Sequence, residues 1–123
     1  ATHQALILDD HLERLRQLGP LGEAVAGWLE FYERWDVEKY GMEGGPLHDP
    51  CVIAYLLDPG LFDAKDCNVQ IEVTSPLTRG MTVVDWWGVT GEPANCTVVR
   101  TVDSPGFVDL LIERIGRLPV APV

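Results

Sequence analysis

The chain has 123 residues, of which 46% are hydrophobic and 23% are charged, a composition typical of one globular domain with a moderate core. Its formal net charge of −10 argues against a phosphate-backbone partner and against an anionic membrane surface. The sequence contains no basic stripe with interleaved aromatic residues and no apolar run of transmembrane length, so it predicts no nucleic-acid partner and no membrane partner.

The three cysteines indicate a reducing environment. Cys51 lies in an apolar run, and Cys67 and Cys96 begin apparent strands. Their number is odd and no CxxC spacing is present, which does not fit a disulfide framework. We therefore expect reduced thiols and a cytoplasmic location.

Two helices are predicted at the start of the chain. The segment 7–20, ILDDHLERLRQLGP, is typical of a short helix, with capping-box spacing between Asp10 and Glu13 and a Gly-Pro stop. A longer helix is predicted over about 21–39. Its apolar residues recur at helical spacing and form one stripe of Leu21, Val25, Trp28, Leu29, Tyr32 and Trp35.

A third helix is predicted from Asp49 to about Leu57, after the glycine-rich loop YGMEGGPLH. It is apolar nearly all round, so we expect it to be buried on most sides. Locally, Asp49 is well placed as its N-cap, with Pro50 at the first helical position. Gly44 and Gly45 would then allow an unusual backbone turn.

The second half changes period. NVQIEVTS alternates between apolar and polar residues, and MTVVDWW and CTVVRTV are rich in β-branched and aromatic residues. These segments predict a three-stranded antiparallel meander. A last helix follows, with Ser104 as its cap and Pro105 at its first position. The sequence of this chain alone therefore predicts an α+β fold of about four helices and three strands, with no internal domain boundary.

Five segments resemble the C-terminal part of the nucleoside hydrolases, the inosine–uridine-preferring ribohydrolases and their pyrimidine-preferring bacterial relatives. They are THQAL, GGPLHDPCVIAYLLDPGLF, TRGMTVVDWW, GEPANCTVV and DSPGFVDLLIERI, in this order and spacing. PLHDP is the most specific element and GMTVVD the next. The resemblance covers essentially the whole chain and implies an α/β family fold. It also implies hydrolysis of the N-glycosidic bond of a ribonucleoside.

The resemblance gives roles to His48 and Asp49. Asp49 matches a ligand of the family's active-site calcium, and His48 matches a histidine implicated in protonating the departing nucleobase. Calcium with oxygen ligands can hold the sugar diol and lower the pKa of a bound water. An imidazole can deliver a proton near neutral pH while oxocarbenium character develops on the ribose.

The resemblance also places the end of the second helix beside the nucleobase. Tyr32, Asp36 and Tyr40 recur at i, i+4 and i+8 and share one face. Tyr40 or Asp36 would contact the base. The alternative is that Tyr32 packs in the core and Asp36 is solvated.

Part of the family pattern is absent from this sequence. The DxDxxxDD cluster that supplies most of the calcium carboxylates is missing, and so is the Glu/Asn segment that binds ribose. Because calcium takes about six to eight oxygen ligands, we expect these residues alone to bind it weakly and to be inactive. Apolar helices without their cover also predict a homo-oligomer, or a chain that lacks its N-terminal half.

Two other functions are compatible with the sequence. The chain could be a non-catalytic binding or oligomerisation module derived from the family. It could also be a small metal-binding domain that uses His3, His48 and Asp49, although nothing in their spacing supports this. His11 is expected at the surface or in a cap, Asp85 is expected to bond a neighbouring loop, and one of Trp86 and Trp87 is expected in the core.

Overall fold

The computed structural model describes the backbone of residues 1–119 and the side chains of these residues except 33–37. Within this range the chain forms the four predicted α-helices. The elements in order are η1 (Thr2–Gln4), β1 (Leu6–Ile7), α1 (Asp9–Arg16), α2 (Pro20–Tyr40), β2 (Gly45–Pro46), α3 (Asp49–Leu57), η2 (Pro59–Leu61), β3 (Phe62–Ile71), β4 (Thr82–Asp85), β5 (Cys96–Val102) and α4 (Ser104–Gly116).

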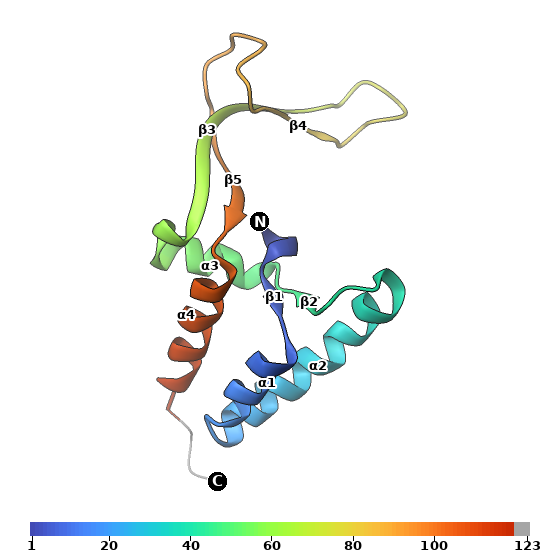
Figure 1. The fold of residues 1–123 in the computed structure, drawn as a ribbon. Helices are drawn as coiled ribbons and strands as arrows, with labels where there is room; N and C mark the ends of the chain where they lie inside the picture. The colour runs from blue at the N-terminus through green and yellow to red at the C-terminus, as the bar shows by residue number, and fades with distance from the viewer. Residues whose placement is uncertain (120–123) are drawn as a thin grey trace. The chain divides into compact units, whose positions relative to one another are not determined.

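The chain forms two compact units, whereas the sequence had suggested no internal boundary. Unit 1 combines residues 1–62 with the segment that begins at Thr101, and it holds all four α-helices. Unit 2 is the segment Asp63–Arg100, which contains most of β3, all of β4 and most of β5. Figure 1 shows the helices of unit 1 and the strands of unit 2.

The core of unit 1 is built around the contact between α1 and α2. Gly22 is required there, because a Cβ at this position would lie 1.9 Å from the carbonyl oxygen of Leu15. The apolar stripe predicted for α2 is partly wrong. Ala26, which the stripe omitted, is buried, whereas Trp28, which it included, is 69% exposed. The core cluster comprises Ala5, Ile7, Leu12, Leu15, Ala26, Leu47, Cys51, Ala54, Phe107 and Val108.

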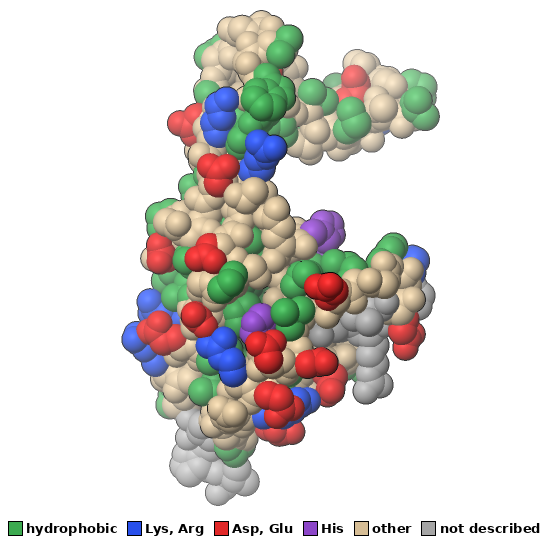
Figure 2. All heavy atoms as spheres, viewed as in Figure 1, with side chains coloured by type: hydrophobic (Ala, Val, Ile, Leu, Met, Phe, Trp, Pro, Cys, Tyr) green, Lys and Arg blue, Asp and Glu red, His purple; other side chains and the backbone are tan. Residues whose placement is uncertain are grey.

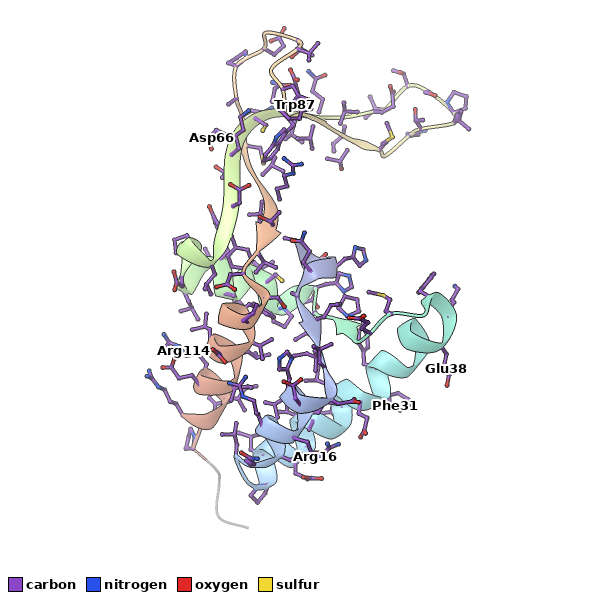
Figure 3. The ribbon with its side chains drawn as sticks, in the orientation of Figure 1. Arg16, Phe31, Glu38, Asp66, Trp87 and Arg114 are labelled. Carbon is purple, nitrogen blue, oxygen red and sulfur yellow. The ribbon has the colours of Figure 1, made fainter. Side chains whose placement is uncertain are left out.

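An ion-pair network joins the same two helices. Arg16 of α1 contacts Glu13 at 2.8 Å, Glu30 at 3.1 Å and Glu23 at 3.8 Å. Figure 3 labels Arg16 where the ends of α1 and α2 meet. The carboxylates raise the pKa of Arg16, although partial desolvation acts in the opposite direction. Acidic side chains are prominent on the face of unit 1 in Figure 2, with basic ones interspersed, as expected from the net charge.

A short antiparallel ladder joins β1 to β2 and leads into α3. Leu6 pairs with Pro46 and Ile7 with Gly45, and the Leu47 N–H donates to the Ala5 carbonyl at 2.9 Å. The adjacent Gly44 is required, since a Cβ there would lie 2.0 Å from the Ile7 carbonyl oxygen. The expected unusual turn at Gly44 and Gly45 is thus wrong, because neither has a positive φ; close approach of the backbone explains Gly44 instead.

The three-stranded sheet has the order β4-β3-β5, which differs from the predicted meander. β3 and β4 form the expected antiparallel pair, in register from Asn68↔Asp85 to Ile71↔Thr82. Asn95 then attaches the returning chain to the other side of β3. Its N–H donates to the Cys67 carbonyl, and its side-chain amide bonds both the N–H and the carbonyl of Val69, at 2.8 and 3.0 Å. The longest strand is therefore central.

Trp86 and Trp87 lie in a turn after β4 rather than in a strand. Trp86 is half-buried, with Lys65 and Arg100 over its ring at 5.5 and 5.1 Å, while Trp87 is exposed (Figure 3). Asp85 bonds the following loop, as predicted. Its carboxylate accepts from the Thr90 hydroxyl at 2.6 Å and from the Thr90 and Val89 N–H groups at 2.8 Å, and these bonds lower its pKa.

The starts of three helices differ from the sequence prediction. Asp103, not Ser104, caps α4: its backbone is extended and its side chain accepts from the Gly106 N–H at 3.3 Å. His48, not Asp49, precedes α3, so Asp49 already lies inside the helix and makes no cap bond. Before α1, the Leu8 N–H donates to Nδ1 of His11 at 3.2 Å, in place of the predicted Asp10–Glu13 box.

We predict that Asp103→Ala destabilises unit 1 by about 1 kcal/mol, because the amide of Gly106 loses its acceptor. Ser104→Ala is the matched control and should leave the stability nearly unchanged. Urea unfolding of the two variants, followed by circular dichroism, measures the difference. Equal losses in both variants, or a larger loss in Ser104→Ala, would contradict the assignment.

The turn after β3 should respond to acid. The Thr74 hydroxyl, followed by the Thr74 and Ser75 N–H groups, lowers the pKa of Glu72 to about 2 from an ordinary 4.5. Because the folded pKa is depressed, the turn is fully stabilised above the ordinary value and loses this contribution as pH falls through about 2. The amide proton shifts of Thr74 and Ser75 should titrate near pH 2, and Glu72→Gln should abolish the step. A midpoint near 4.5 would contradict the contact.

Candidate functional site

His48 and Asp49 line one hollow of unit 1, with a volume of about 210 Å³. The hollow lies where β2 passes into α3, and Pro46, Leu47 and Pro50 form part of its wall. The remaining lining residue is Tyr32 of α2. A histidine, a carboxylate and a phenol therefore face the same small space.

The backbone around His48 is held on both sides. On one side the Leu47 N–H is bonded to Ala5 across the β1–β2 ladder. On the other, the Cys51 N–H donates to the His48 carbonyl at 3.2 Å, and the Cys51 thiol contacts the Leu47 carbonyl at 3.2 Å. Burial raises the pKa of the Cys51 thiol, so this cysteine is a structural neighbour and not a reactive thiolate.

The imidazole of His48 is half-buried and contacts a second imidazole. The ring of His3, from η1, meets it edge to face, with centroids 5.3 Å apart and an interplanar angle of 89°. The sequence did not identify this contact. The presence of THQAL among the segments of the resemblance pointed to this part of the chain, and the weakly supported metal-binding alternative had grouped His3 with His48.

Asp49 is exposed in the first turn of α3, and its carboxylate is not used in a cap bond. A carboxylate outside any cap bond is an oxygen ligand of the kind that calcium binds. Among the side chains that the structure describes, no group of three or more histidine, cysteine, aspartate or glutamate residues could hold a metal. One carboxylate does not fit a complete calcium site, and the trio His3, His48 and Asp49 does not form a metal site either.

Tyr40, Asp36 and Tyr32 have different places relative to the hollow. Tyr40 ends α2, is 61% exposed and carries the Lys39 ammonium over its ring at 5.0 Å; it is not among the lining residues. The side chain of Asp36 lies outside the described residues. Tyr32 is 55% exposed and lines the hollow, so the expectation that it packs in the core is wrong. Its i, i+4 spacing to Asp36 had placed Tyr32 on the face expected beside the base, whereas its place in the predicted apolar stripe favoured the core.

A second, apolar groove of about 370 Å³ lies between α3 and α4. Its wall comprises Asp49, Pro50, Ile53, Ala54, Leu57, Phe107, Leu110, Leu111 and Arg114. The predicted burial of α3 on most sides is wrong, because Val52, Ile53, Leu56 and Leu57 are 50% to 72% exposed. We call the surface formed by Val52, Ile53, Leu56 and Leu57 the α3 patch. Ile53 and Leu57 also line the groove, and the groove adjoins the hollow because Asp49 and Pro50 line both of them.

The three cysteines are free thiols, as predicted, with Cys51 and Cys67 buried and Cys96 exposed. Within the described part of the chain, no helix is both long enough and apolar enough to cross a bilayer.

Comparisons with known proteins agree on one family. Residues 1–109 match the family model described as inosine-uridine preferring nucleoside hydrolase. The pyrimidine-specific ribonucleoside hydrolase RihA of Shewanella sp. (strain ANA-3) is 52% identical over 94% of this chain and 37% of its own length. RihA of Enterobacter sp. (strain 638) is 45% identical over 97% of this chain and 39% of its own length.

Solved structures show the same relationship. A purine-preferring ribonucleoside hydrolase from Gardnerella vaginalis matches with a TM-score of 0.77 and 29% identity, over 94% of this chain and 37% of that one. A plant nucleoside hydrolase matches with a TM-score of 0.75 and 25% identity, over 95% and 39%. The chain thus spans less than two-fifths of the length of these relatives and corresponds to their C-terminal portion. It belongs to the inosine–uridine preferring nucleoside hydrolase family.

Proposed function

We propose that this chain supplies the nucleobase side of the active site of a calcium-dependent ribonucleoside hydrolase. The reaction is cleavage of the N-glycosidic bond by water, which gives a nucleobase and ribose. The observation that carries the proposal is the shared hollow of His48, Asp49 and Tyr32 at the start of α3. The family membership of residues 1–109 supports it.

His48 is proposed as the general acid. As the glycosidic bond breaks, the base leaves as an anion unless a proton reaches one of its ring atoms. An imidazole that lines the hollow can donate this proton at neutral pH. The half-buried position limits competing water at the ring.

Asp49 is proposed as one ligand of calcium, with the other ligands on residues outside this chain. Its exposed carboxylate can accept a cation without losing a bond, because it serves no cap. The 123 residues alone are therefore proposed to bind calcium weakly or not at all and to be inactive.

Tyr32 is proposed to contact the base with its ring or hydroxyl, together with Tyr40 and Asp36 as predicted from the sequence. A phenol offers both a stacking face and a hydrogen bond, which suits a heterocycle. The 52% identity to a pyrimidine-specific relative makes pyrimidine ribonucleosides the proposed substrates. The free thiols suit a cytoplasmic location, which we propose with the same function.

The α3 patch is proposed to be covered in the working enzyme, either by the remainder of a hydrolase domain or by a second copy of this chain. Four large apolar side chains at least half exposed on one short helix form a surface that isolated soluble domains rarely keep. A non-catalytic oligomerisation module is the second candidate function, and this same patch favours it.

A chimera tests the catalytic proposal. The matched segment of the Shewanella RihA is replaced by this chain, and ribose release from uridine and inosine is measured with calcium present. We expect release, with uridine preferred. His48→Ala should lower kcat by about 10²–10⁴-fold with a smaller change in KM, since it removes a general acid. Asp49→Ala should weaken calcium retention, measured by metal analysis after dialysis.

Unmodified RihA is the positive control, and circular dichroism establishes that each chimera is folded. A folded chimera without ribose release from any common nucleoside would rule out the enzyme and leave the oligomerisation module. Full activity in both His48→Ala and Asp49→Ala would show that the site is elsewhere.

The 123-residue chain alone should self-associate at micromolar concentration through the α3 patch. Light scattering should give the mass of a dimer or a larger species. Ile53→Glu should reduce that mass, because it places a charge in the patch; Leu77→Glu, which alters an exposed leucine of unit 2, is the matched control. A monodisperse monomer would contradict the prediction.

A further inference from the structure

The His48 imidazole has one described contact that restrains its plane. Among the described residues, no hydrogen bond reaches the ring nitrogens of His48, and the ring of His3 is its aromatic neighbour at 5.3 Å. Rotation of the His48 ring about its Cβ–Cγ bond would break the perpendicular arrangement of 89°. Perpendicular contacts between aromatic rings are favourable because the positive edge of one ring meets the negative face of the other.

The backbone of His3 is itself well anchored. η1 is closed by bonds from the Gln4 N–H to Ala1 at 2.8 Å and from the Ala5 N–H to Thr2 at 3.1 Å. The Gln4 side chain accepts from the Val102 N–H at 3.2 Å, which ties η1 to the segment before α4 within unit 1. Ala5 is fully buried and bonded to Leu47, one residue before His48.

We propose that His3 is a positioning residue that holds the plane of the His48 ring toward the hollow. The catalytic consequence rests on the proposed function of His48 as general acid. Proton transfer requires the donor nitrogen to point at the acceptor, and a ring free to rotate about its Cβ–Cγ bond spends less time in that direction. His3 itself is exposed and does not line the hollow, so it acts through His48 and not on the substrate.

The chain contains three histidines, His3, His11 and His48, so NMR can follow each imidazole separately. In the 123-residue chain we expect a nuclear Overhauser effect between the rings of His3 and His48, and a ring-current shift of the His48 protons. His3→Ala should remove both effects. His3→Phe should retain them, because phenyl and imidazole rings both offer an edge and a face.

His11→Ala is the matched control, since it removes an imidazole that contacts Leu8 instead, and it should leave the His48 signals in place. The backbone amide spectrum of each variant shows that the fold is intact. His48 signals that are identical in the parent chain and His3→Ala would overturn the proposal.

The same variants in the RihA chimera give the functional readout. His3→Ala should lower kcat about tenfold with KM within about twofold, and His3→Phe should restore most of the loss, as expected for lost orientation. An unchanged kcat in His3→Ala would overturn the positioning role. If the parent chimera releases no ribose, the proposed function fails, and the NMR comparison still decides whether His3 holds the His48 ring.

Discussion

The close approach of the Gly44 backbone to the Ile7 carbonyl determines where the candidate site can form. No other residue type fits there, because any Cβ would lie 2.0 Å from that oxygen. This approach allows β2 to lie against β1, and the bond from Leu47 to Ala5 follows directly. His48 is the next residue, so its backbone position results from the ladder, and η1, which immediately precedes β1, brings His3 into contact with it. Two strands of two residues each thus connect the buried core of unit 1 to the contacting imidazoles of His3 and His48.

The site that results is coherent but partial. A histidine, a carboxylate and a phenol line one hollow, and among the described residues Asp49 is the single calcium ligand that we propose. A family fold in which this chain occupies less than two-fifths of the length of its relatives accounts for both observations. The α3 patch fits the same proposal, since its apolar side chains face outward in this chain and we propose that further chain or a second copy covers them.

The sequence was most informative where one physical signal dominated. Helical periodicity located the four helices, and the family resemblance carried by PLHDP pointed to His48 and Asp49, which line one hollow and whose roles stay predictions. Prediction from the sequence failed where two neighbouring residues were equally suited to cap a helix. Asp103 and Ser104 are both good N-cap residues, and only the backbone geometry selects Asp103. It also failed where the decisive contact was distant. The Asn95 side chain, which binds the backbone of Val69, places β5 beside β3. The Leu15 carbonyl approaches α2 at Gly22, and on that helix Ala26 is buried whereas Trp28 is exposed.

Unit 1 is discontinuous, and this has a consequence for how the protein is made. Ile7 and Phe107 share one core, yet all of unit 2 lies between them in the sequence. On the ribosome, α1, α2 and α3 emerge before α4, so their core cannot close until α4 has followed. During that interval they expose surfaces that bind chaperones or other nascent chains. The inserted hairpin acts as a loop whose closure entropy opposes assembly, so early formation of the β3–β4 pair, which shortens the effective loop, should accelerate folding of unit 1.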